Sequence, residues 1–236
     1  SDMDSLVQAH TTALTKSILP WLHHFNDNNP QQMERAFSKH LTILPNATIE
    51  TIEEACSKGG YTHVHILAHG ALDKNRQGNH YGINLCRRRG SQSQRGAFET
   101  VSGEQLAMAL GSMRVSCPGS GGKLGGEHPL VVTVASCDSA NQGDVIYDGA
   151  SFAHELHQSG IPFVVASQFP LSFAGSVVMA KELYQKLMCG VDPRVAVHAL
   201  RGKLAALNDP GVHDWAALVV YAALPDDLNS RLVEYR

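Results

Sequence analysis

A histidine and a cysteine, each close to the end of a strand-like run, are the residues of this chain that could together do covalent chemistry. His69 follows the run 62–68 and precedes Gly70, where the backbone can turn sharply. Cys137 comes shortly after the run 130–135, and small and polar residues follow it. A thiol is a weak nucleophile until it loses its proton, which a nearby imidazole can take and later return to a leaving amine. The pair therefore predicts nucleophilic cysteine catalysis, provided that the two side chains meet.

The segments that would position these residues alternate between strand-like and helix-like patterns. Apolar runs typical of strands lie at 41–45, 62–68, 81–85, 130–135, 161–167 and 215–222. Amphipathic or capped segments typical of helices lie at 5–26, 30–39, 49–58, 103–110, 148–160, 172–189 and 193–207. This alternation predicts an α/β fold with a mainly parallel central sheet flanked by helices. Active sites of such sheets lie beyond the carboxyl ends of the strands, where His69 and Cys137 are expected.

Each kind of residue in this pair also has a purely structural interpretation. Cysteine most often behaves as a small buried hydrophobe. Four cysteines keep that interpretation: Cys56, Cys86, Cys117 and Cys189. His63 and His65 would share a strand face with His69 and are interpreted as core or interface histidines. Cys137 differs from the other cysteines because the polar residues after it can form only an exposed loop.

The composition limits the class of protein. With 236 residues, of which 43% are hydrophobic, the chain can bury a sizeable core. The net charge of −3 gives no basic excess of the kind expected of a nucleic-acid binder. The longest apolar run, 215–224, is far shorter than the roughly 20 residues that cross a bilayer, so no membrane contact is expected. Five cysteines without a CxxC pair, and an acidic N-terminus unlike a signal peptide, predict a cytoplasmic location.

Three further segments match known binding motifs only in part. The glycine-rich segment 119–126 lacks two residues of the phosphate-loop pattern and follows no predicted strand, so it is interpreted as a loop and no cofactor is expected. His154 and His157 lack a second cluster with ligand spacing, so no metal is expected. The basic segment 87–89 fits an acidic partner or a processing site, although short charge runs are usually solvated loops.

The order of these motifs resembles that of the CHAT peptidases, which are relatives of caspases and separase. In that family a His-Gly follows one strand and an Ala/Ser-Cys follows the next, as at His69-Gly70 and Ser136-Cys137. Further segments fit the family pattern, and the resemblance covers roughly residues 41–225. It implies a caspase-like sandwich in which Cys137 is the nucleophile and His69 the general base. It also implies an oxyanion hole formed by the backbone N–H groups of Gly70 and Cys137.

The same resemblance indicates which residues would contact the substrate. In caspases the segment that matches 167–173 walls the specificity pocket. Three residues of that segment are implied as contacts: Ser167, Gln168 and Phe169. Asp138, next to the cysteine, is a fourth candidate. The family's tryptophan is replaced here by Phe169 and its two acidic positions by Ser172 and Phe173, so we expect a neutral or weakly acidic pocket.

The predicted domain organisation has two parts. Residues 1–40 are expected to form an N-terminal helical extension, and residues 41–236 the caspase-like domain. By resemblance, the chain is expected to be the effector part of a larger bacterial signalling or antiviral protein. Its expected partners are a protein substrate and a sensor or regulatory domain or subunit, with no direct binding of nucleic acid. The alternative is a catalytically silent module that acts in assembly or binding, although such a module needs neither His69 nor Cys137.

Overall fold

The computed structural model describes residues 2–22, 37–72, 81–87, 98–111, 128–136, 152–207, 213–224 and 226. These residues divide into two compact units. The helical unit comprises Ser1–Ile43 and Leu171–Leu218, and the sheet unit comprises Leu44–Pro170 and Val219–Arg236.

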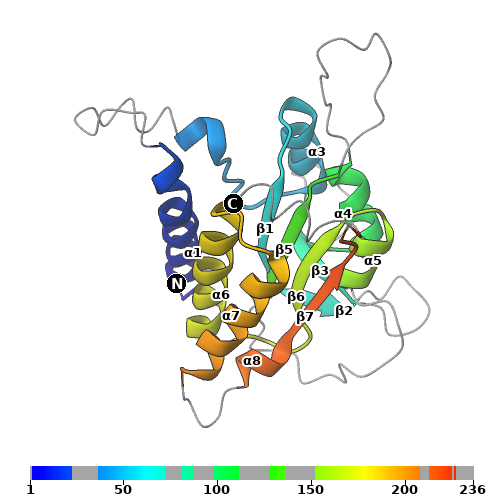
Figure 1. The fold of residues 1–236 in the computed structure, drawn as a ribbon. Helices are drawn as coiled ribbons and strands as arrows, with labels where there is room; N and C mark the ends of the chain where they lie inside the picture. Colours follow the sequence, from blue (N-terminus) through cyan, green and yellow to red (C-terminus); the bar gives the residue numbers. More distant parts are fainter. Residues whose placement is uncertain are drawn as a thin grey trace. The chain divides into compact units, whose positions relative to one another are not determined.

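The main sheet of the sheet unit contains four strands in the order β1-β5-β6-β7 (Figure 1). The strands are β1 (His63–Ala68), β5 (Val131–Ser136), β6 (Phe163–Ser167) and β7 (Leu218–Ala222). β1 pairs in parallel with β5, and β5 in parallel with β6. The centre of β5 and β6 is fully buried, as expected for parallel strands whose two faces are both covered. The predicted α/β fold with a mainly parallel sheet flanked by helices is confirmed.

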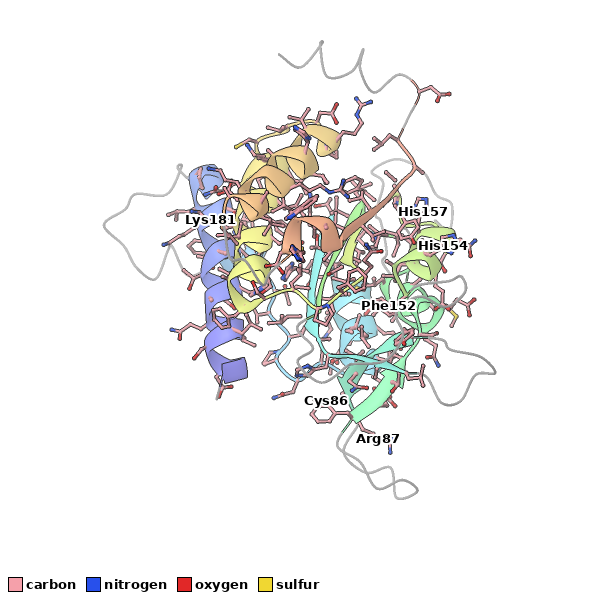
Figure 2. All side chains as sticks on the ribbon, turned by 90° about the horizontal axis from the view of Figure 1, so that it is seen from below. Cys86, Arg87, Phe152, His154, His157 and Lys181 are labelled. Atoms are coloured by element: carbon pink, nitrogen blue, oxygen red, sulfur yellow. The ribbon has the colours of Figure 1, made fainter. Side chains whose placement is uncertain are left out.

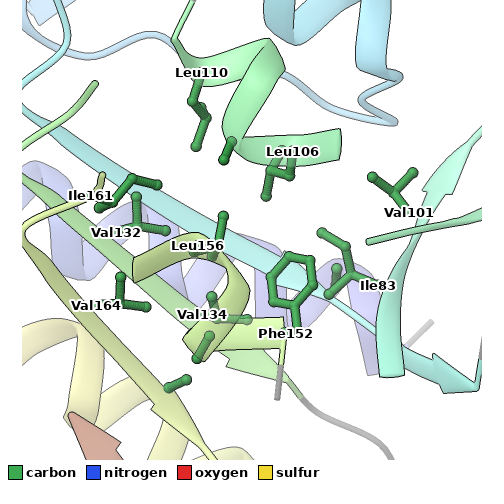
Figure 3. Close-up of a cluster of buried hydrophobic side chains, with 14 of the residues drawn as sticks. Ile83, Val101, Leu106, Leu110, Val132, Val134, Phe152, Leu156, Ile161 and Val164 are labelled. Carbon is green, nitrogen blue, oxygen red and sulfur yellow. The ribbon is translucent and has the colours of Figure 1, made fainter. Parts of the chain in front are cut away.

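Three helices of the same unit share a hydrophobic core with this sheet (Figure 3). They are α3 (Ile49–Lys58), α4 (Gly103–Leu110) and α5 (Phe152–Gln158). Leu106 and Leu156 of α4 and α5 meet Val132 and Val164 of the strands in this core, and all four side chains are at most 1% exposed. Thr48 and Ser102 form the capping boxes that begin α3 and α4. The sequence predicts an N-cap at Thr48 and a capping box at Ser102. A buried carboxylate also joins α5 to the start of α4, because Glu155 accepts a hydrogen bond of 2.8 Å from Gly103 N.

A second, smaller sheet of three antiparallel strands has the order β2-β3-β4. Its strands are β2 (Gly70–Leu72), β3 (Tyr81–Cys86) and β4 (Phe98–Val101). The sequence predicts only the middle one. β2 and β4 have three and four residues, which is too short for a periodic pattern to stand out. Because β2 begins one residue after β1 ends, His69 connects a strand of the main sheet directly to a strand of the small one.

The helical unit is built on α1 (Asp2–Ile18), η1 (Leu19–Leu22), α6 (Phe173–Met188), α7 (Pro193–Ala205) and α8 (Asp214–Ala217). α6 packs against α1 on one side and α7 on another (Figure 1). α1 gives way to a 3₁₀ turn around Pro20, which lacks the N–H that would continue the helix. Ser172 caps α6, and Asp192 with Pro193 begins α7, as predicted.

A buried carboxylate fixes the start of α6. Asp214 accepts hydrogen bonds from Ser172 N (2.9 Å) and Ser172 Oγ (2.6 Å), and Ser172 Oγ in turn accepts one from Gly175 N (2.9 Å). A Cβ atom added to Gly175 would overlap the Asp214 carboxylate. The negative charge therefore lies against the N-terminal end of α6, where the helix dipole favours it.

One of the predicted strands, 41–45, is wrong, and another, 215–222, is wrong in part. Residues 41–44 form no strand and lead into a turn at 45–46, in which Asn46 has a φ of 54°. Ile43 and Leu44 are 52% and 39% exposed, so this apolar run is not a buried one. Residues 214–217, expected in part as strand, form the helix α8, and the strand begins at Leu218. The predicted helix start at residue 148 and the glycine-rich segment 119–126 lie outside the described residues.

Candidate active site

His69 lies at the carboxyl end of β1, as predicted, and its side chain is exposed. Its backbone is held from both sides. Ala68 before it pairs with Ser136 of β5, and Gly70 after it pairs with Ile83 of β3. The His69 carbonyl also accepts a hydrogen bond of 2.8 Å from Asn84 N. The imidazole therefore projects from a backbone position that two ladders define, a supported arrangement of the kind that a general base requires.

The end of β5 lies beside the end of β1. The register is continuous from His63 opposite Val131 to Ala68 opposite Ser136. Ser136 is the last residue of β5, and Cys137 follows it in the sequence. Cys137 and Asp138 themselves lie outside the described residues. The structure thus fixes the strand that leads to the predicted nucleophile, and that strand is the direct neighbour of the one that leads to His69.

The three candidate substrate contacts lie at the end of β6, on the other side of β5. Ser167 ends that strand and donates a hydrogen bond from its hydroxyl to the Phe169 carbonyl. Gln168 and Phe169 are exposed, Phe169 to 45%. Because β1, β5 and β6 are parallel neighbours, their carboxyl ends meet at one edge of the sheet. His69 and the segment 167–169 therefore lie at the same edge, with the end of β5 between them.

The other histidines of β1 do not belong to this edge. His63 begins the strand at its opposite end, where its Nδ1 lies 2.9 Å from Thr62 Oγ1. Burial lowers the pKa of His63 below the ordinary value, which favours the neutral ring. His65 is half-buried in the middle of the strand. Of the three histidines on β1 and its end, only His69 is exposed.

The His154–His157 pair has a structural role in the packing of α5 (Figure 2). Both rings lie against Tyr221 of β7, with centroid separations of 5.3 Å and 6.0 Å. His157 Nδ1 lies 2.9 Å from the Ile161 carbonyl and donates its proton to that oxygen. Across the residues that the structure describes, no three His, Cys, Asp or Glu side chains are grouped to hold a metal ion.

The described cysteines offer a comparison for Cys137. Cys56 is buried in the core, and that burial raises the pKa of its thiol. Cys86 is half-buried at the end of β3, beside Arg87 (Figure 2), and Cys189 is exposed at the end of α6. All three are free thiols, and the two in the sheet unit, Cys56 and Cys86, lie on α3 and β3.

Sequence reasoning missed the strand β2, which begins directly beside His69. Gly70, Ala71 and Leu72 pair with Ile83, Gly82 and Tyr81 of β3. The predictions treat Gly70 as a turn, whereas its backbone continues in extended form into the small sheet. A segment of three small and apolar residues carries no periodic signal, and its pairing partner determines its conformation.

The whole sequence was compared with models of known protein families. The model of the CHAT domain matches residues 4–223, which is nearly the whole chain. Comparison with curated proteins finds no match. The match begins at residue 4, and the predicted boundary of an extension at residue 40 stays a prediction. No described helix has the length and hydropathy needed to span a bilayer. The CHAT family is related to the caspase-like cysteine peptidases. On the extent of this match, the chain belongs to the CHAT domain family.

Proposed function

We propose that this protein is a cysteine endopeptidase in which His69 activates Cys137. One observation carries the proposal: Ala68 and Ser136 are paired in neighbouring parallel strands, and the two reactive residues come directly after them in the sequence. Neighbouring strands lie about 4.8 Å apart, so a continuation of this register by one residue would bring imidazole and thiol within reach of each other. The exposure of His69 further supports a role at a substrate site.

The proposed reaction has two steps. His69 takes the proton of the Cys137 thiol, and the sulfur attacks the carbonyl carbon of the scissile peptide bond. The protonated His69 gives its proton to the leaving amine as the C–N bond breaks, which leaves a thioester on Cys137. Water, deprotonated by His69, then hydrolyses the thioester and restores the thiol. The N–H groups of Gly70 and Cys137 are proposed to stabilise the negative oxygen of each tetrahedral intermediate.

Selective labelling tests whether the thiol is activated. Near pH 6.5, iodoacetamide is expected to modify Cys137 first, because a thiol with an ordinary pKa is almost entirely protonated there. Mass spectrometry after limited labelling identifies the residue. Cys189 is the internal control, because it is an exposed free thiol of the helical unit. In His69→Ala the preference for Cys137 is expected to disappear. Equal labelling of Cys137 and Cys189 in the wild-type protein would contradict the activation of Cys137 by His69.

The described part of the proposed pocket carries no charge. Ser167, Gln168 and Phe169 are neutral, and the acidic residues that would select a basic P1 side chain are absent from 167–173. A peptide library is therefore expected to show cleavage after uncharged or long flexible residues, without a strict requirement for Arg and without a preference for Asp. Cleavage confined to Arg and Lys, and lost in Asp138→Asn, would contradict this expectation and assign the pocket acid to Asp138.

The wider role proposed for the enzyme rests only on what is typical of the CHAT family. We propose a cytoplasmic effector that cleaves a protein substrate when a sensor or regulatory domain or subunit activates it, in bacterial signalling or antiviral defence. The alternative, a silent caspase-like module for assembly or binding, predicts no difference in thiol reactivity between Cys137 and Cys189. The labelling experiment therefore separates the two functions before a natural substrate is known.

A further inference from the structure

We propose that Asn84 of β3 is a positioning residue, which holds the ring of His69 in the orientation that activates Cys137. The proposal rests on the proposed peptidase function and adds a third residue to the pair. The contact assigned to Asn84 is a hydrogen bond from one ring N–H of His69 to the amide oxygen, Oδ1. The residues that carry the proposal lie in a row across the small sheet: His69, Asn84 and Thr100.

The pairing of the small sheet places Asn84 beside His69. Gly70 lies opposite Ile83, and one residue away on each strand Asn84 N donates a hydrogen bond of 2.8 Å to the His69 carbonyl. His69 and Asn84 are therefore opposite each other in the antiparallel register. The side chains of opposite residues share a face of the sheet, and their Cβ atoms are about 5 Å apart. An imidazole and an amide can form a hydrogen bond across this spacing.

A threonine on the next strand fixes the Asn84 amide. Thr100 of β4 lies opposite Asn84, and its Oγ1 donates a hydrogen bond of 3.1 Å to Asn84 Oδ1. The Thr100 methyl group lies over Gly82, because a Cβ atom added to that glycine would come within 2.9 Å of it. With the methyl group over Gly82, the hydroxyl is turned to the amide. The amide oxygen therefore has a defined position on the face that His69 shares.

The His69 ring needs such a partner because packing does not fix it. Asn84 and Thr100 are half-buried, whereas His69 is exposed. The two strand ladders define the backbone of His69, but they leave the side chain free to rotate about its two single bonds. A catalytic group works well only when a neighbouring hydrogen bond or close packing holds its side chain.

The amide oxygen can supply this hydrogen bond. A carbonyl oxygen has two lone pairs, so Asn84 Oδ1 can accept from Thr100 and from His69 together. A general base presents one ring nitrogen without a proton to the thiol, and the other nitrogen then carries the proton. An acceptor for that N–H selects the tautomer, orients the ring and stabilises the imidazolium that forms when Cys137 loses its proton.

Labelling of Cys137 tests the proposal without a peptide substrate. Asn84→Leu removes the acceptor and is expected to lower the rate of labelling by iodoacetamide near pH 6.5 by about 10- to 100-fold, the effect of one hydrogen bond to a charged group. The rate at Cys189 is the internal control. Asn84→Asp keeps an acceptor oxygen on a side chain of the same length and is expected to restore the preference for Cys137.

The labelling result separates this proposal from the function on which it rests. If the wild-type protein shows a preference for Cys137 and a folded Asn84→Leu protein keeps it in full, Asn84 has no positioning role and the pair of His69 and Cys137 stands. If the wild-type protein shows no preference, activation by His69 fails, and the role of Asn84 fails with it.

Peptide cleavage separates positioning from a general effect on the fold. Asn84→Leu is expected to lower kcat by about 10- to 100-fold and to leave KM nearly unchanged, because the hydrogen bond gains strength only as the imidazolium forms. Thr100→Val removes the hydroxyl that holds the amide and is expected to have a smaller effect on kcat. Glu99→Gln is the matched control, because Glu99 lies opposite Leu85 and alternation puts its side chain on the other face of the small sheet. It is expected to keep the wild-type kcat.

A double variant keeps the test open if Asn84→Leu alone does not fold. Asn84→Leu with Thr100→Val leaves neither group of the pair unsatisfied, so it is expected to fold and to show the low kcat of Asn84→Leu. A wild-type kcat in the folded double variant overturns the proposal. A loss confined to KM, or an equal loss of kcat in Asn84→Leu, Asn84→Asp and Glu99→Gln, overturns it as well.

Discussion

Cys137→Ala is expected to lower kcat/KM for peptide cleavage by at least about 10³-fold, because the sulfur forms the bond to the substrate. His69→Ala is expected to have a similar effect, since without the base the thiol stays protonated at neutral pH. Removing both residues is expected to cost little more than removing one, because they act as a unit. The measurement is kcat/KM for a fluorogenic peptide from the library of accepted sequences.

The controls for this result use a histidine and a cysteine that have no role in the proposed mechanism. His63→Ala and Cys189→Ala change a histidine at the other end of β1 and an exposed thiol. Each catalytic variant is expected to stay within about 1–2 kcal/mol of the wild-type free energy of unfolding, since His69 is exposed and the role proposed for Cys137 is chemical rather than structural. Full activity in Cys137→Ala would reject the mechanism. The melting curve of the same sample would show whether a loss of activity is caused by unfolding.

Acidification is expected to cost the wild-type protein about 3 kcal/mol of stability through His10 alone. His10 of α1 is 2% exposed, and its Nε2 lies 3.2 Å from Ser176 Oγ of α6. Ser176 donates its own proton to the Phe173 carbonyl, so His10 is the donor in this bond. Burial lowers the pKa of His10 from 6.5 to about 4. Between these two values the unfolded chain binds a proton that the folded chain does not, and stability therefore falls as the pH falls.

Denaturant unfolding from pH 7 to about pH 4 measures this effect. His10→Gln keeps a donor at the position of Nε2 and does not titrate, so its stability is expected to fall by about 3 kcal/mol less than that of the wild-type protein. His198→Gln, an exposed histidine on α7, is the matched control and is expected to follow the wild-type curve. If the free energy of unfolding falls equally with pH in the wild-type protein and in His10→Gln, this expectation is wrong. His10 would then be protonated in the folded state without loss of stability.

The centre of the main sheet could be predicted from the sequence because β5 and β6 are nearly continuous apolar runs. Residues 131–135 and 163–166 are buried throughout, which is the condition under which such a run is unambiguous. The same rule fails at 41–45, where the apolar residues are exposed, and at Trp215, which lies on a short helix held by Asp214. Apolar character alone does not show whether a segment finds a partner to bury it.

The candidate site could be predicted only as far as local sequence allows. The pattern places His69 and Cys137 at strand ends, and a parallel sheet brings strand ends to one edge. It does not say that β1 and β5 are neighbours, because pairing between segments far apart in the sequence depends on the whole sheet. The register of Ala68 with Ser136 supplies that step. β2 was missed for the same reason, since its extended form depends on β3.

Asp214 and Gly175 can change during evolution in one order only. The carboxylate of Asp214 occupies the space that a side chain at position 175 would need. While Asp214 is present, every substitution of Gly175 meets this overlap. Once glycine stands at position 214, no side-chain atom of that residue overlaps a Cβ atom at position 175, but the two hydrogen bonds to Ser172 are then gone. A return to aspartate at 214 is blocked from that point. Because of this one contact in the helical unit, the effect of a substitution at either position depends on which residue already stands at the other.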